Sequence, residues 1–231
     1  MISDNLKIVE ANILAACNRA NRDKDDVTLI CVSKTKPVEM IYEAMECGYR
    51  TFGENKVQEM CAKYEEINDS SIDWHLIGHL QTNKVKYIVD KACLIHSVDS
   101  LHLATTISKE AVKRNVTANI LIEVNVAKED TKFGVSVEEC EDLIVEISKL
   151  PNISIKGLMT IAPFVENPEE NRVHFANLRK LLIDINSKNI DNVFMNVLSM
   201  GMTNDYEVAI EEGATLVRVG TGIFGERQYH R

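Results

Sequence analysis

The chain has 231 residues, of which 45% are apolar, and its formal net charge is −9. This length suits one large hydrophobic core, so we expect one domain over residues 1–231 rather than two. The negative charge argues against nucleic acid or an anionic membrane surface as a general partner.

Short β-rich runs alternate with helical patterns along the chain. Residues 3–21 carry apolar side chains at helical spacing, which predicts an N-terminal helix. The β-rich runs fall near residues 27–33, 51–53, 73–78, 93–98, 119–126, 153–160, 193–199 and 215–220. The helical patterns between them fall near residues 37–46, 55–67, 82–90, 100–114, 136–149, 168–187 and 203–212.

Strands that alternate with helices indicate parallel β-α-β units. Eight such runs in a little over 200 residues predict an α/β protein with a single (β/α)8 barrel, flanked by the N-terminal helix. A doubly wound open sheet is the alternative fold. In a barrel of this kind the active site lies at the carboxyl ends of the strands, and phosphate groups are often held after strands seven and eight.

A lysine follows the first predicted strand. By the alternation of side chains along a strand, Ile30, Val32 and Lys34 share one face, so Lys34 points into the upper interior of the barrel if the other two fill it. Lys36 has the same parity but stands next to Pro37, where the chain turns outward. Desolvation lowers the pKa of an amine and makes it a competent nucleophile toward an aldehyde. A lysine on the surface is the alternative reading of this position.

The last two predicted strands end in residues that favour an anion. Ser199 offers a hydroxyl, and glycines such as Gly220 allow backbone amides to approach a phosphate closely. Arg218 shares the face of Gly220 and points inward, so it needs a carboxylate or a ligand atom as a partner. Thr203 could instead be an ordinary helix N-cap.

In a closed barrel the eighth strand neighbours both the seventh strand and the first. Ser199, Gly220, Thr221 and Lys34 are therefore expected to converge at one side of the barrel rim. A phosphate-binding cradle beside a reactive lysine suits pyridoxal 5′-phosphate, which carries both an aldehyde and a phosphate. A Schiff-base aldolase acting on a sugar phosphate is the competing possibility.

The chain resembles the pyridoxal phosphate homeostasis protein family in six stretches between about residues 27 and 225. They are VSKTKP at 32–37, FGEN at 52–55 with VQE at 57–59, WHLIGHLQTNK at 74–84, GLMT at 157–160, LSMGM at 198–202 and VRVGT at 217–221. The resemblance implies a barrel like the N-terminal domain of alanine racemase.

The resemblance also assigns roles to individual residues. It implies that Lys34 forms the Schiff base with pyridoxal phosphate and that Arg218 faces the pyridine nitrogen. Asn55 is implied as a further pocket residue. The phosphate-binding positions are implied to be Ser199, Gly220 and Thr221.

We expect a binding protein that takes part in intracellular pyridoxal phosphate homeostasis without turnover of amino acids, and we predict no catalytic residue. A two-base racemase needs a second acid or base on the opposite face of the cofactor. In alanine racemase a C-terminal domain supplies it, whereas this chain ends at Arg231, soon after the eighth strand. A pyridoxal-phosphate-dependent racemase or decarboxylase remains the alternative. Enzymes that lack the cofactor are possible recipients, and we expect a monomer or a weak dimer.

Other candidate sites are weaker. His75 and His79 are four residues apart without an intervening glutamate, so the metalloprotease motif is missing and structural roles are favoured over metal binding. No two of the six cysteines form a C-x-x-C motif. We therefore expect them to be reduced thiols in the core. The sequence shows neither a secretory leader nor an apolar run that could span a membrane, so we expect a cytoplasmic protein.

Overall fold

The computed structural model describes residues 1–129 and 133–226. Eight strands are present in the described chain: β1 Thr28–Val32, β2 Thr51–Glu54, β3 Asp73–Leu76, β4 Leu94–Val98, β5 Ala118–Glu123, β6 Ile153–Met159, β7 Val197–Met202 and β8 Leu216–Val219. The α-helices are α1 Ile2–Arg19, α2 Val38–Glu46, α3 Val57–Ile67, α4 Leu101–Arg114, α5 Cys140–Ile147, α6 Arg172–Asn186, α7 Tyr206–Glu211 and α8 Thr221–Phe224. Three 3-10 helices complete the described elements: η1 Lys24–Asp26, η2 Thr82–Tyr87 and η3 Pro168–Asn171.

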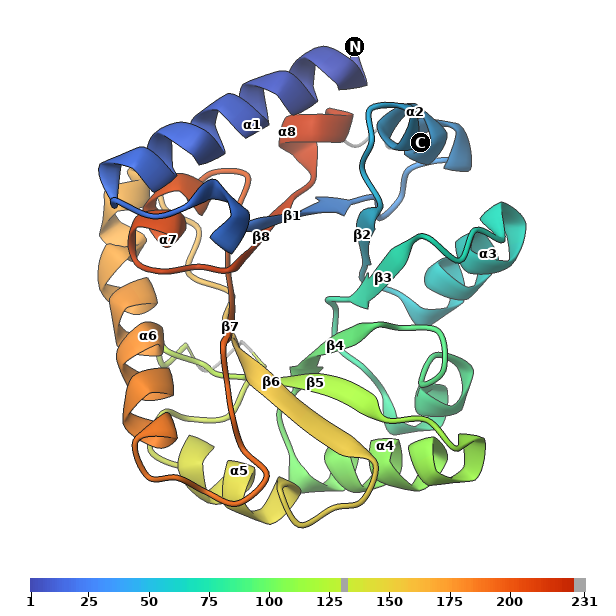
Figure 1. Ribbon diagram of the computed structural model, residues 1–231, viewed down its shortest axis with the longest axis vertical. Helices are drawn as coiled ribbons and strands as arrows, with labels where there is room; N and C mark the ends of the chain where they lie inside the picture. The colour runs from blue at the N-terminus through green and yellow to red at the C-terminus, as the bar shows by residue number, and fades with distance from the viewer. Residues whose placement is uncertain (130–132, 227–231) are drawn as a thin grey trace.

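The strands form a closed barrel in chain order, and each strand is parallel to its neighbours (Figure 1). The barrel closes where β8 pairs with β1, with Arg218 opposite Ile30. Helices surround the barrel on the outside. The predicted (β/α)8 barrel is therefore confirmed, and the alternative of an open doubly wound sheet is wrong.

The predicted N-terminal helix is also confirmed. α1 packs along α7 and α8, at the top left of Figure 1, through a buried apolar face that includes Leu6 and Ile13. The side chain of Asn5 donates a hydrogen bond to the carbonyl oxygen of Ile223 in α8. The helix thereby supports the segment that follows β8, where the predicted phosphate cradle lies.

Two segments differ from the predicted elements. The stretch near 82–90 forms the 3-10 helix η2 rather than an α-helix, with bonds such as Ile88 N to Val85 O. Val85 and Ile88 of this segment are buried in the core. The short helix α8 follows β8 directly and was not expected, because four residues carry no detectable helical periodicity.

The barrel separates an outer core from an inner one. The outer core lies between the strands and the helices and contains most of the buried apolar side chains. The inner core is small, and its buried members are Ile30, Val32, Ile77, Leu94, Leu121, Met159 and Leu216. Ile30 and Val32 lie in it, as predicted, so the inward face of β1 leads directly to Lys34.

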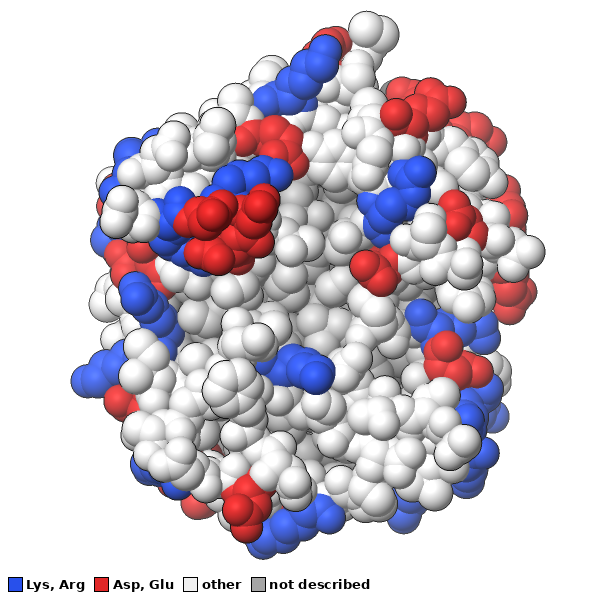
Figure 2. Space-filling view, viewed as in Figure 1, with Lys and Arg blue, Asp and Glu red and all other residues white. Residues whose placement is uncertain are grey.

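Charged side chains of both signs are interspersed around the periphery of the face shown in Figure 2, and its centre is largely uncharged. This pattern is consistent with the overall excess of acidic residues and shows no basic stripe on this face. Among the described residues, no helix combines the length and the apolar character that a membrane crossing requires.

Candidate cofactor site

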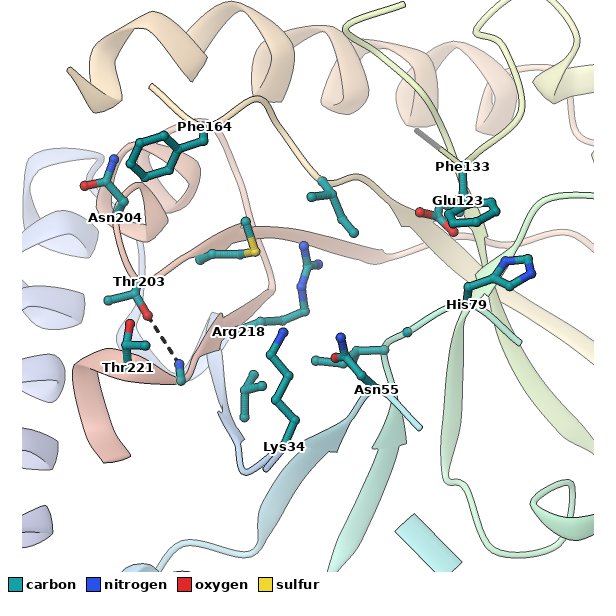
Figure 3. A pocket seen from close by; sticks show the side chains of 16 residues that line it. Lys34, Asn55, His79, Glu123, Phe133, Phe164, Thr203, Asn204, Arg218 and Thr221 are labelled. Carbon is teal, nitrogen blue, oxygen red and sulfur yellow. Dashed lines mark hydrogen bonds between the residues drawn. The ribbon is translucent and has the colours of Figure 1, made fainter. Parts of the chain in front are cut away.

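A cavity of about 750 Å³ opens at the carboxyl ends of the strands (Figure 3). Its described lining consists of residues at or just after strand ends: Val32, Lys34, Asn55, Ile77, Gly78, His79, Glu123, Phe133, Ile161, Phe164, Met202, Thr203, Asn204, Arg218, Gly220 and Thr221. This is the end of the barrel at which active sites are built in (β/α)8 proteins. The cavity is large enough for a small cofactor together with a second group.

Lys34 lies in a turn between β1 and α2, and its side chain points into the cavity toward Arg218. The turn is closed by a hydrogen bond from the amide of Lys36 to the carbonyl oxygen of Ser33. Lys36 itself points elsewhere: its Nζ donates to the carbonyl oxygens of Phe224 and Gly225, at 3.0 and 2.9 Å, and so caps α8. The two lysines of this segment therefore have different environments, as their positions relative to the strand end predicted.

A buried ionic cluster holds the turn that carries Lys34. Nζ of Lys63, which is only 5% exposed, donates to the carbonyl oxygen of Ser33 at 2.8 Å and to the carboxylates of Glu54 and Glu59 at 2.7 and 2.8 Å. The hydroxyl of Ser33 donates to Glu54 at 2.6 Å, and the amide of Thr35 donates to Glu59 at 2.5 Å. Both neighbours of Lys34 in the chain are thus tied to one cluster.

The same turn is strained. Thr35 has a φ of +62°, a left-handed conformation that is costly for a β-branched residue. Its hydrogen bond to Glu59 holds it there. Burial raises the pKa of Glu54, and it outweighs the opposing effect of Lys63 and Ser33. The strained backbone and the buried charges both lower the stability of the fold, and both hold this turn in the conformation that directs Lys34 into the cavity.

The segment after β8 forms a cradle of backbone amides. The amides of Gly220 and Gly222 approach Oγ1 of Thr203 at 3.3 and 3.5 Å, and the first of these contacts is drawn in Figure 3. A Cβ added at Gly222 would lie 3.0 Å from a methyl group of Val219 and 3.1 Å from one of Thr203, so a side chain would crowd the cradle. Thr221 adds a hydroxyl at the same edge of the cavity.

Arg218 is fully enclosed at the floor of the cavity and starts a chain of hydrogen bonds. Its guanidinium donates to Oγ of Ser199 at 2.5 Å and to the carbonyl oxygen of Thr160 at 2.8 Å. Nδ1 of His96 lies 2.9 Å from Oγ of Ser199, and its Nε2 lies 2.8 Å from Nδ1 of His75. Because arginine only donates, Oγ of Ser199 accepts from Arg218, whereas the direction of the Ser199–His96 and His96–His75 hydrogen bonds depends on the histidine tautomers.

Burial keeps both histidines of this chain of hydrogen bonds uncharged. Burial lowers the pKa of His75 to about 4, and burial together with His75 and Arg218 lowers that of His96 well below its usual range, so both rings are neutral near pH 7. Burial also lowers the pKa of Arg218 to about 10, opposed by the nearby Glu123 and Asp205. Arg218 therefore remains charged at neutral pH.

The structure brings together most of the residues predicted from the sequence. Lys34, Asn55, Arg218, Gly220 and Thr221 all line the one cavity. Ser199 lies below Arg218 and is not among the lining residues that the structure describes. A direct role of Ser199 in phosphate binding stays a prediction, and Thr203, considered above only as a helix cap, is a hydroxyl at the cradle.

Asn55 owes its place to a glycine in the neighbouring loop. A Cβ added at Gly78 would lie 2.4 Å from the carbonyl oxygen of Asn55 and 2.7 Å from its Cα. The two backbones are therefore in direct contact, which only glycine allows. This contact sets the position of the Asn55 side chain at the cavity wall.

Several site residues escaped sequence reasoning. Glu123 ends β5, lines the cavity and is 6% exposed. Burial, reinforced by Asp99 and opposed by Arg218, raises the pKa of Glu123 to about 7. For Glu123, the sequence signal that could have been used is an acidic residue inside an apolar strand run. Phe133, which stacks on His79, lies in an irregular segment, where no comparable sequence pattern points to it.

Neither histidine singled out in the sequence has a metal-binding environment. His75 is part of the hydrogen-bonded series that runs from Arg218 through Ser199 and His96. His79 lies at the cavity and stacks on Phe133, with ring centroids 4.1 Å apart. Within the described residues, no group of three or more histidine, cysteine, aspartate or glutamate side chains could hold a metal ion.

The barrel and its cavity define the class of the protein. Residues 5–228 match the family described as alanine racemase, N-terminal domain. The match covers nearly the whole chain, so the chain belongs to this family.

Comparison with individual proteins identifies a smaller group within this family to which the chain is similar. The pyridoxal phosphate homeostasis protein of Aquifex aeolicus is 49% identical over 226 residues, which is 98% of each chain. A solved structure of a protein from Bifidobacterium adolescentis is 37% identical, covers 96% of this chain and 94% of its own, and has a TM-score of 0.90. PipY of Synechococcus elongatus, solved with PLP bound, is 34% identical, covers 97% of this chain and all of its own, and has a TM-score of 0.84. Within the larger family, the chain belongs with the pyridoxal phosphate homeostasis proteins.

Proposed function

We propose that this chain binds pyridoxal 5′-phosphate as a Schiff base on Lys34 and takes part in controlling the intracellular supply of the cofactor, without turning over amino acids. The observation that carries the proposal is the convergence of Lys34, Arg218 and the Gly220–Thr221 cradle in one cavity. The similar protein PipY has been solved with PLP bound, which supports the same ligand here.

The residues present fit this cofactor. The cradle offers the amides of Gly220 and Gly222 with the Thr203 hydroxyl, and a side chain at Gly222 would crowd it. Such a set of amides and hydroxyls is suited to a phosphate. Lys34 points into the same cavity and supplies the amine for covalent attachment. When bound, the cofactor supplies an aldehyde and an electron-withdrawing ring.

The environment of Arg218 supports binding over catalysis. Arg218 remains charged at neutral pH, and its position is determined by Ser199 and the carbonyl oxygen of Thr160. If Arg218 faces the pyridine nitrogen, as the family resemblance implies, its positive charge would disfavour protonation of the ring and so weaken the use of the ring as an electron sink. The network keeps this charge in place rather than supplying a mobile proton.

An absorption spectrum tests covalent attachment. The purified protein with added cofactor should show a Schiff-base band near about 420 nm, and Lys34→Ala should lack it. Lys56→Ala is the matched control, because Lys56 is an exposed lysine beside the cavity residue Asn55, and this variant should keep the band. A band that survives in Lys34→Ala would refute attachment at this residue.

A second experiment separates binding from turnover. The loaded protein is incubated with single amino acids in deuterated water, and exchange of the α-proton is followed by NMR. We expect no exchange above that of free cofactor at the same concentration. Exchange that is fast, catalytic in the protein and lost in Lys34→Ala would establish a racemase instead, and conversion of the amino acid to its amine and CO2 would establish a decarboxylase.

A further inference from the structure

One side of the cavity carries the cationic side chains of Lys34 and Arg218, and the opposite side carries the acidic side chain of Glu123. Lys34 follows β1 and Glu123 ends β5, and in a closed barrel of eight strands in chain order these two strands lie on opposite sides. In the view of Figure 3, Glu123 is on the same side of the cavity as Phe133 and His79, and away from Lys34. The cationic groups and the phosphate cradle therefore occupy one side of the cavity and leave the Glu123 side for another group.

Glu123 is a buried carboxylate directed at this space. It is 6% exposed and lines the cavity, and no hydrogen bond or ion pair to its carboxylate is found among residues 1–129 and 133–226. The guanidinium of Arg218 attracts Glu123 electrostatically, but its hydrogen bonds go to Ser199 and to the carbonyl oxygen of Thr160. A buried carboxylate without a hydrogen-bond partner is costly, and a ligand that supplies a positive charge would reduce the cost.

Two aromatic rings line the same cavity as this carboxylate. The rings of Phe133 and His79 are stacked, with centroids 4.1 Å apart and planes inclined by 17°, and Phe133 is 56% exposed at the mouth of the cavity. A carboxylate next to aromatic faces is the arrangement that recognises organic ammonium ions through charge and cation–π attraction. One carboxylate with aromatic neighbours does not suit a divalent metal, which requires several oxygen or nitrogen ligands.

We propose that Glu123, Phe133 and His79 form a subsite for an organic cation, the ammonium group of an amine that occupies the cavity together with the phosphorylated cofactor. That the two ligands share the cavity rests on the proposed function, whereas binding of the cation does not. The cavity volume of about 750 Å³ accommodates both.

Tetramethylammonium is a suitable probe, because it carries one charge and cannot condense with an aldehyde. The cofactor-free protein is titrated with tetramethylammonium at constant ionic strength and pH 8, and binding is followed by the saturation-transfer NMR signal of the probe. tert-Butanol, a neutral molecule of similar shape, is titrated in parallel. We expect saturable binding of the cation and at least roughly tenfold weaker binding of the alcohol.

Three variants locate the binding. Glu123→Gln preserves the shape of the side chain and removes its charge, and should weaken tetramethylammonium binding roughly tenfold or more. Phe133→Leu should weaken it by a smaller factor. Glu146→Gln removes the same charge from an exposed residue outside the cavity and should bind as the natural chain does.

Two results would overturn the subsite: unchanged binding in Glu123→Gln, or equal loss in Glu123→Gln and Glu146→Gln, which would indicate a general surface effect. The cofactor spectrum of each variant is recorded separately. If the Lys34 band is absent while the cation binds at Glu123, the proposed function fails and the subsite stands. If the band is present while the cation does not bind, the reverse holds.

Discussion

At the scale of single residues, the unusual feature of the molecule is that its cavity keeps several polar groups out of water. Arg218, His96 and Ser199 satisfy one another by hydrogen bonds, whereas Glu123 does not share in that network. The residues of the network fix the shape of the cavity, whereas Glu123 has no part in the network. We therefore expect substitutions in the network to lower the stability of the protein and a neutral substitution at Glu123 to raise it.

Replacing Glu123 by Gln should stabilise the protein at pH 8. The folded protein raises the pKa of Glu123 from 4.5 to about 7, so the folded state binds the proton more tightly than the unfolded state, and stability falls as the pH rises between these values. The shift corresponds to roughly 3 kcal/mol at most, which Gln avoids. Thermal melts should show a higher Tm for Glu123→Gln at pH 8 and little difference at pH 4.5. An equal difference at both pH values would contradict this.

Replacing Ser199 by Ala should destabilise the protein even without cofactor. The substitution removes one hydrogen bond from the buried Arg218 and one from the buried His96, at a cost of roughly 1–3 kcal/mol. Urea unfolding of the cofactor-free protein measures it. If Ser199 served only to contact the phosphate, the cofactor-free protein would lose nothing.

At the scale of elements, the turn after β1 depends on a charge cluster contributed by two other elements. Glu54 ends β2, and both Lys63 and Glu59 belong to α3. Their positions explain why a short turn with a strained Thr35 can hold Lys34 in a defined place. The cluster connects the stability of α3 to the geometry of the turn that carries Lys34.

Lys63→Met should therefore be strongly destabilising. It removes the ammonium that faces two carboxylates, one of them buried, and such a loss costs about 3–5 kcal/mol. Chemical denaturation measures the loss, and Glu54→Gln in the same chain should restore part of it. Lys113→Met is the matched control: its ion pair with Glu110 is exposed, so the change should cost less than about 1 kcal/mol. Similar losses in the two variants would exclude a special role of the cluster.

The elements themselves were largely predictable, because strands and helices leave local periodic patterns. The parity of Ile30 and Val32 correctly placed Lys34 at the cavity. The contact of Ser199 with Arg218 and His96 was not predictable, since it depends on the relative register of β4, β7 and β8. Local pattern contains no information about register between distant strands.

At the scale of the whole molecule, the barrel gives the cavity two walls of opposite charge. The segments after β7 and β8 carry the proposed phosphate cradle, and Asn5 of α1 donates a hydrogen bond to Ile223 in the second of them. Across the barrel, β5 carries Glu123. The closed order of the strands is what brings residues nearly 190 positions apart, Lys34 and Thr221, to one cavity.

The cradle should make the phosphate group decisive for binding. Thermal shifts are compared for pyridoxal phosphate and for pyridoxal, which has the aldehyde but no phosphate, at equal concentration. A ligand that binds only the folded state stabilises it in proportion to the logarithm of its concentration over Kd. We expect a clear rise in Tm with pyridoxal phosphate and a much smaller rise with pyridoxal, and equal shifts would refute the cradle.

The central claim is that Lys34 carries the cofactor, and chemical trapping tests it most directly. The protein is loaded with pyridoxal phosphate, reduced with borohydride and digested, and the modified peptide is sequenced by mass spectrometry. We expect one phosphopyridoxyl group, attached to Lys34. Modification at another lysine with Lys34 unmodified, or no modification at all, would contradict it.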